Sequence, residues 1–142
     1  MTDSTEHILI PVDDSDPSER AIDFVHDRFS GSETRITLLH VIPSGSPMTD
    51  TRVFQEAAKR EEVEELLAEY KQRLGEKELD VSVSITEGTP DREIVDFAVE
   101  NDISQIIIGS HGRRGINRVL LGSVAEKVVR RAPMPVTVVR QN

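Results

Sequence analysis

The sequence predicts an open α/β sheet of five parallel strands with helices on both faces, in the strand order 3-2-1-4-5. Short apolar runs alternate along the chain with longer segments of helical periodicity. Such alternation is typical of parallel sheets whose strands are joined by right-handed crossovers. The chain of 142 residues shows neither an internal repeat nor a linker, so we expect a single domain over residues 1–142.

The first strand and the first helix are predicted close to the N-terminus. HILIPVD, residues 7–13, is a continuous apolar run that ends in an acid, as expected for a strand covered on both faces. A helix start follows, because Asp16 can cap, Pro17 suits the first turn and Glu19 completes a capping-box pattern. We expect this helix to end near Phe29.

The second strand and the second helix are separated by a polar loop. RITLLHVI, residues 35–42, has the composition of another buried strand, and residues 43–50 form a loop rich in Pro, Gly and Ser. The long helix that follows keeps a largely apolar face to about Leu74, and Gly75 can stop it.

The alternating segment VSVSIT, residues 81–86, predicts a half-exposed strand at an edge of the sheet. With this strand at an edge, 3-2-1-4-5 is the simplest order. Thr89 is expected to cap a third helix that begins at Pro90. We expect a fourth strand at residues 105–110, a short helix that begins at about Ser123, and a fifth strand at residues 135–140.

Composition narrows the class of protein. A net charge of −9 argues against a nucleic-acid binder, and no stretch approaches the roughly 20 apolar residues of a membrane span. The first residues lack the features of a signal peptide and the chain contains no cysteine, so we expect a cytoplasmic protein without nucleic-acid or membrane partners. The lysine-poor, acidic composition fits either a salt-rich cytoplasm or an ordinary acidic protein.

A ligand site is expected where the strand order reverses, between the first and fourth strands. In open parallel sheets, ligands bind beyond the carboxyl ends of the strands at that point. The first strand ends in Pro11, Val12 and Asp13, and the fourth leads into Gly109. The Asp13 carboxylate can accept hydrogen bonds from ribose hydroxyls.

The stretch GSHGRRGINRVLLGS has the properties of a phosphate site. Gly109 and Gly112 allow close backbone approach, while Gly122 and Ser123 stand at a predicted helix start, where free N–H groups and the helix dipole favour anions. Three arginines add positive charge: Arg113, Arg114 and Arg118. The same glycines could merely turn the chain and cap the helix, so their spacing alone leaves a structural role open.

These residues resemble the universal stress protein family. Gly109-x2-Gly112-x9-Gly122-Ser123 fits the G-x2-G-x9-G-[ST] signature of the ATP-binding branch. Val12-Asp13-Asp14-Ser15 fits its V-D-x-S element, and residues 37–43 resemble its second strand. The resemblance covers essentially the whole chain. It implies the five-stranded fold of that family, which is similar to the adenine-nucleotide α-hydrolase fold.

The resemblance also implies an ATP-binding, regulatory stress-response protein. By analogy, four residues contact the phosphates: Gly112, Gly122, Ser123 and Val124. Asp13 holds the nucleoside end and the backbone of Val41 meets adenine, while the remaining pocket is lined by Pro11, Val12, Ile108 and Gly109. Mg²⁺ or Mn²⁺ can accompany the phosphates, with no side chain assigned to the ion.

The loop contains two further candidates. His111 could line the phosphate pocket. Arg113, which is followed by Arg114 and Gly115, departs from a generic family member and either strengthens phosphate binding or makes the loop mobile. The other histidines predict no metal site, since His7 and His26 are expected to face solvent and His40 to lie in the core.

No catalytic set accompanies the candidate site. The sequence lacks a G-x-x-x-x-G-K-[ST] loop and a G-x-S-x-G elbow, so we expect a binding protein with at most slow hydrolysis. The alternative is an interaction protein of the same fold that does not bind nucleotides. An enzyme that cleaves between the α- and β-phosphates is less favoured, because the S-G-G-x-D-S loop of that group is missing after the first strand.

The last strand predicts a homodimer. Residues 135–140 are expected at the second edge of the sheet, where Val136, Val138 and Val139 make the strand apolar with no charge before Arg140. Such an edge favours pairing, and antiparallel pairing of two copies about a two-fold axis would cover it. The family resemblance implies the same arrangement.

Overall fold

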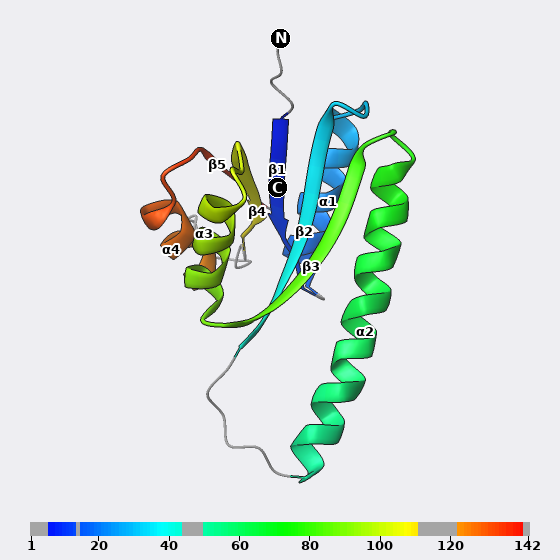
Figure 1. Cartoon of the computed structure of the whole chain (residues 1–142), viewed down its shortest axis with the longest axis vertical. Coiled ribbons are helices and arrows are strands. Elements are labelled where there is room, and N and C mark those ends of the chain that lie inside the picture. The colour runs from blue at the N-terminus through cyan, green and yellow to red at the C-terminus, as the bar shows by residue number, and fades with distance from the viewer. Residues whose placement is uncertain (1–5, 14, 44–49, 111–121, 141–142) are drawn as a thin grey trace.

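The computed structural model describes residues 6–13, 15–43, 50–110 and 122–140 (Figure 1). Strands and helices alternate along these residues, as the sequence predicts. The strands are β1 (Glu6–Pro11), β2 (Thr34–Pro43), β3 (Asp80–Gly88), β4 (Gln105–Gly109) and β5 (Val136–Val139). The helices are α1 (Asp16–Arg28), α2 (Asp50–Gly75), α3 (Pro90–Glu100) and α4 (Ser123–Arg131).

The five strands form one parallel sheet in the order β3-β2-β1-β4-β5, which confirms the predicted order. β3 lies at an edge, as the alternating pattern of residues 81–86 predicts. Helices α1 and α2 pack on one face of the sheet, whereas α3 and α4 pack on the other (Figure 1). None of the helices in the described segments is long and apolar enough to cross a membrane.

The continuous apolar runs of the central strands supply two hydrophobic cores, one on each face. Because side chains alternate across a strand, Ile8 and Ile10 face α1 and α2, whereas Leu9 faces α3 and α4. The same alternation places Ile107 in the first core and Ile106 in the second. All five side chains are fully buried, which explains why neither β1 nor β4 shows polar alternation in its sequence.

The helix ends agree with the sequence prediction except at α1. Thr89 is the N-cap of α3 and α2 ends at Gly75, as predicted, whereas the residue that caps α1 is Ser15 and not Asp16. Neither Ser15 nor Thr89 makes a side-chain capping hydrogen bond. In the turn that follows α2, Glu78 adopts a left-handed conformation with φ of 64°.

His7 does not face solvent, contrary to the prediction. Its Nε2 lies 2.8 Å from Thr37 Oγ1, which in turn lies 3.1 Å from Ser82 Oγ, so the three side chains form a polar row across β1, β2 and β3. Burial, and after it the positive charge of Arg35, holds the pKa of His7 below its ordinary value of 6.5.

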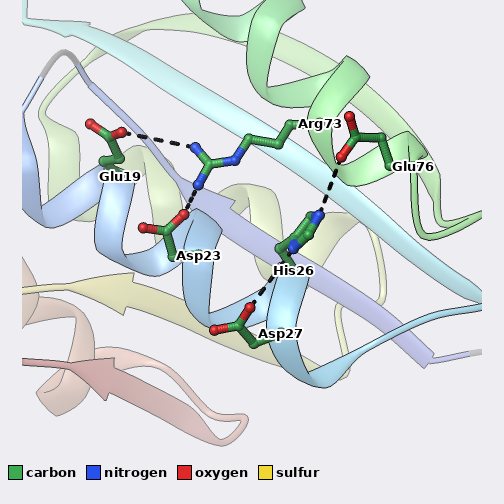
Figure 2. Close-up of polar contacts among 6 residues, drawn as sticks. All are labelled: Glu19, Asp23, His26, Asp27, Arg73 and Glu76. Atoms are coloured by element: carbon green, nitrogen blue, oxygen red, sulfur yellow. Dashed lines mark hydrogen bonds and ion pairs between the residues drawn. The ribbon is translucent and has the colours of Figure 1, made fainter.

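Charged side chains connect α1 to α2 on their outer surfaces (Figure 2). Arg73 of α2 pairs with Asp23 and lies 3.9 Å from a carboxylate oxygen of Glu19, both on α1. His26 Nε2 lies 3.4 Å from Glu76 Oε1. His26 is therefore partly covered by the α1–α2 contact, with a side chain that is 25% exposed, so it faces solvent only in part.

The first turn of α1 packs directly on β4. An ideal Cβ built at Gly109 would overlap the carbonyl group of Pro17 and lie 3.0 Å from its Cα. Gly109 therefore lets the helix approach the strand, which is a packing role that the sequence analysis did not anticipate.

We expect Gly109→Ala to lower the free energy of unfolding by about 1–3 kcal/mol, because α1 must move away from the sheet to accept the new methyl group. Urea unfolding of both proteins measures the difference. Gly75→Ala is the matched control, since a Cβ there meets no atom within 4 Å and the change should stabilise the helix slightly. Equal stabilities of Gly109→Ala and the parent chain would contradict the packing role.

The lowered pKa of His7 predicts a specific acid sensitivity. The unfolded chain binds a proton at His7 more readily than the folded chain. The free energy of unfolding therefore decreases as the pH falls from 6.5, the ordinary pKa of histidine, toward the lowered pKa of His7 in the folded chain. The free energy of unfolding of His7→Gln, measured at about pH 7.5 and about pH 5.5, should fall less on acidification than that of the parent chain. An identical pH dependence would show that His7 titrates normally.

Candidate functional site

A cavity of about 340 Å³ opens at the carboxyl ends of β1, β2 and β4. It lies at the predicted point, where β1 is flanked by β2 on one side and β4 on the other. Its walls come from strand ends and from the first turns of three helices. The lining residues are Pro11, Val12, Asp13, Ser15, Pro17, Ser18, Leu39, His40, Val41, Pro43, Pro90, Ile94, Ile108, Gly109, Gly122, Ser123, Val124 and Ala125.

The starts of α1, α3 and α4 border this cavity, at Pro17, Pro90 and Ser123 respectively. The first backbone N–H groups of a helix have no partner within the helix, and the helix dipole places positive potential at the same end. Pro17 and Pro90 carry no N–H group themselves, but the dipoles of all three helix ends, together with the N–H groups at the start of α4, favour a negatively charged ligand. They do so without a lysine or arginine among the lining residues that the structure describes.

Gly122 borders the cavity at the N-cap of α4, with φ of −59° and ψ of 154°. These angles are accessible to any residue, so the backbone conformation does not require glycine here. Gly122 lines the cavity, and it contributes only backbone atoms there. Ser123 and Val124 follow along the same wall, and Ser123 is exposed.

Part of the cavity lining is apolar. Leu39, Ile94 and Ile108 are buried side chains whose surfaces form its base, and Val41 packs against the same core. Pro43 extends the wall at the end of β2. A cavity lined by both helix starts and apolar side chains suits a ligand that carries both an anionic group and an apolar group.

Asp13 also lines the cavity and is already bonded to the start of α1. Its Oδ1 accepts hydrogen bonds from the Ser15 backbone N–H at 3.0 Å, from the Ser18 hydroxyl at 2.9 Å and from the Ser15 hydroxyl. The Asp13 side chain is exposed at the cavity. The carboxylate thus has a fixed position from which it can accept further hydrogen bonds.

The structure brings nine of the predicted site residues together around the cavity: Pro11, Val12, Asp13, Val41, Ile108, Gly109, Gly122, Ser123 and Val124. The other three, His111, Gly112 and Arg113, lie outside the described residues. In the described segments, no group of three or more His, Asp or Glu side chains is arranged to hold a metal ion.

Several lining residues were not among the predicted ones, in particular Ser18, His40, Pro90 and Ile94. One signal for the last two was present in the sequence, since Pro90 marks a helix start directly after the third strand. β3 pairs with β2, so that helix start had to lie at the same edge of the sheet as Val41. His40 was expected in the core but is only partly buried, and its Nδ1 bonds to the Val12 carbonyl at 2.9 Å.

Comparison with known proteins identifies the family. Residues 4–140 match the model of the universal stress protein family. The universal stress protein MJ0531 of Methanocaldococcus jannaschii is 34% identical over 139 residues, which cover 94% of this chain and 81% of that protein.

Solved structures share the fold. The structure of MJ0577, a universal stress protein of the same organism, superposes with a TM-score of 0.75 and 29% identity over 97% of both chains. A universal stress protein from Archaeoglobus fulgidus, solved in complex with dAMP, superposes with a TM-score of 0.66 and 25% identity, covering 94% of this chain and 97% of that one. On these matches, this chain belongs to the universal stress protein family.

Proposed function

We propose that the cavity binds ATP and that the protein is a regulatory stress-response module of the ATP-binding branch. The observation that carries this proposal is the convergence of three helix N-termini and an apolar wall on one cavity beyond β1 and β4. The complex of the Archaeoglobus fulgidus protein with dAMP supports an adenine nucleotide as the ligand. The proposed output is a change in conformation or in partner contacts, with at most slow hydrolysis.

Within this proposal, the two parts of the cavity receive the two ends of the nucleotide. The phosphates contact the backbone N–H groups and the hydroxyl of Gly122, Ser123 and Val124, where the α4 dipole favours negative charge. The base packs on Ile108 and meets the backbone of Val41, and Asp13 accepts from the ribose.

The predicted loop residues complete the phosphate end. We propose that Gly112, His111 and Arg113 contribute to it from the segment that joins β4 to α4. Mg²⁺ or Mn²⁺ would enter with the phosphates and offset their charge, since the cavity wall itself supplies no cluster of metal ligands among the described residues.

Gly122→Val tests the phosphate assignment. The backbone angles at Gly122 accept valine, whereas the substitution adds a side chain at a residue that lines the cavity beside the start of α4. We expect the affinity for ATP, measured by calorimetric titration, to fall by at least about tenfold, corresponding to about 1.4 kcal/mol.

A matched control on the same helix is Val129→Ala, because Val129 is 42% exposed and does not line the cavity. Its ATP affinity should equal that of the parent chain, and urea unfolding of both variants checks that the fold is retained. Unchanged ATP affinity in folded Gly122→Val would overturn the assignment of the phosphates to the start of α4.

We also propose a homodimer formed by antiparallel pairing of β5. This strand lies at an edge of the sheet and pairs with β4 on its inner side. Pro135 and Val139 use their carbonyl groups toward β4, accepting from Ile106 at 2.9 Å and from Ser110 at 3.0 Å. Because backbone groups alternate along a strand, the N–H groups of Val136 and Val138 point away from β4 and are free to meet a second copy.

Val138→Pro tests the pairing of two β5 strands without removing a hydrogen bond within the sheet. Proline removes the outward N–H group but no hydrogen bond to β4, and edge strands tolerate it in that orientation. We expect sedimentation velocity at micromolar concentration to show a dimer for the parent chain and a monomer for this variant, with urea unfolding as the check on folding. A parent chain that sediments as a monomer would contradict the proposed dimer.

A further inference from the structure

The peptide group that joins Val12 to Asp13 is held from both sides by side chains far apart in the sequence. Its carbonyl oxygen lies 2.9 Å from Nδ1 of His40, within β2. Its N–H group donates to the hydroxyl of Ser18, in the first turn of α1, at 2.7 Å. One side chain therefore fixes each polar end of this peptide.

This peptide lies just beyond the end of β1, where regular strand pairing has stopped. The last backbone bond to the neighbouring strand is from the Val12 N–H to the Leu39 carbonyl, at 2.9 Å. The side chains of His40 and Ser18 take over the role that strand pairing plays along β1. A partly buried peptide group left without such partners destabilises the fold.

Ser18 also connects the peptide to the Asp13 carboxylate. The same hydroxyl that accepts from the Asp13 N–H donates to its Oδ1 at 2.9 Å. Ser18 is buried although it is polar, which agrees with a hydroxyl that is satisfied on both sides. The Asp13 backbone and side chain are thus bound to one atom, and the side chain cannot turn independently of α1.

From this geometry we infer that His40 and Ser18 are positioning residues that lock the Val12–Asp13 peptide and thereby aim the Asp13 carboxylate at the nucleoside end of the ligand. This inference rests on the proposed function of the cavity. With Oδ1 committed to α1, the other carboxylate oxygen, Oδ2, is the acceptor that Asp13 presents to a ribose hydroxyl.

The inference fixes the tautomer of His40. A carbonyl oxygen only accepts, so Nδ1 must carry a proton and donate it to Val12. Nδ1 is thereby fully used in positioning, and a variant can be chosen that keeps this one donor while removing the rest of the ring.

His40→Asn and His40→Leu form such a matched pair, because the two side chains have similar size and only asparagine carries an N–H group near the place of Nδ1. We expect His40→Leu to weaken ATP binding about five- to tenfold in calorimetric titration, the equivalent of one lost hydrogen bond. His40→Asn should restore the affinity to within about twofold. Equal losses in the two variants, or none in His40→Leu, would overturn the inference.

A double-mutant cycle shows whether the effect passes through Asp13. In an Asp13→Ala background there is no carboxylate to aim, so His40→Leu should then change the ATP affinity by less than about twofold. The same loss in both backgrounds would mean that His40 acts on another part of the ligand, and would contradict the inference.

Nitrogen-15 NMR of the ligand-free protein tests the positioning separately from binding. We expect the His40 ring in the tautomer protonated at Nδ1, and faster hydrogen exchange of the Asp13 amide in Ser18→Ala than in the parent chain. A ring protonated only at Nε2 would overturn the positioning role even if ATP binds. A parent chain that shows these signals but binds no adenine nucleotide would instead overturn the proposed function, and with it the role of Asp13 toward the ligand.

Discussion

The candidate site depends on one topological constraint, which is that the helices following β1 and β4 lie on opposite faces of the sheet. α1 packs on the face of Ile8 and Ile10, whereas α4 packs on the face of Leu9. Two adjacent parallel strands whose chains leave in opposite directions cannot cover the gap between their carboxyl ends. The cavity lies in that gap, and the helix starts that border it supply backbone donors oriented by the fold itself.

The two glycines that line the cavity, Gly109 and Gly122, have different roles. Gly109 is required because a Cβ would overlap the first turn of α1, so it sets how closely α1 approaches β4. Gly122 has backbone angles that any residue can adopt, so the backbone conformation does not require glycine at this point of the cavity lining. The first glycine therefore serves the fold, and through the position of α1 it also places Ser18 and Asp13.

The fold was largely predictable because its signals are local. The buried runs at residues 7–13 and 105–110 and the alternation at residues 81–86 predicted central and edge strands without knowledge of their neighbours. Apart from the cap of α1, the errors concern contacts made between distant segments. The burial of His7 depends on Thr37 of β2, and the need for glycine at position 109 depends on which helix crosses β4. The strand ends that were predicted to form the site do line one cavity. Ser18 and His40 make hydrogen bonds whose geometry cannot be read from the spacing of residues in the sequence. The roles of His111, Gly112 and Arg113 remain predictions.

Titration of the nitrogen-15-labelled chain with ATP, followed by amide chemical shifts, tests the central claim most directly because it locates the ligand on the structure. Saturable shifts should centre on Val12, Asp13, Val41, Ile108 and Ser123 around the cavity. The groove between α2 and β3, lined by Lys71 and Ile85 among others, should remain unchanged. Shifts confined to that groove, or no saturable shifts with ATP, ADP or AMP in the presence of Mg²⁺, would contradict the assignment of this cavity as an adenine-nucleotide site.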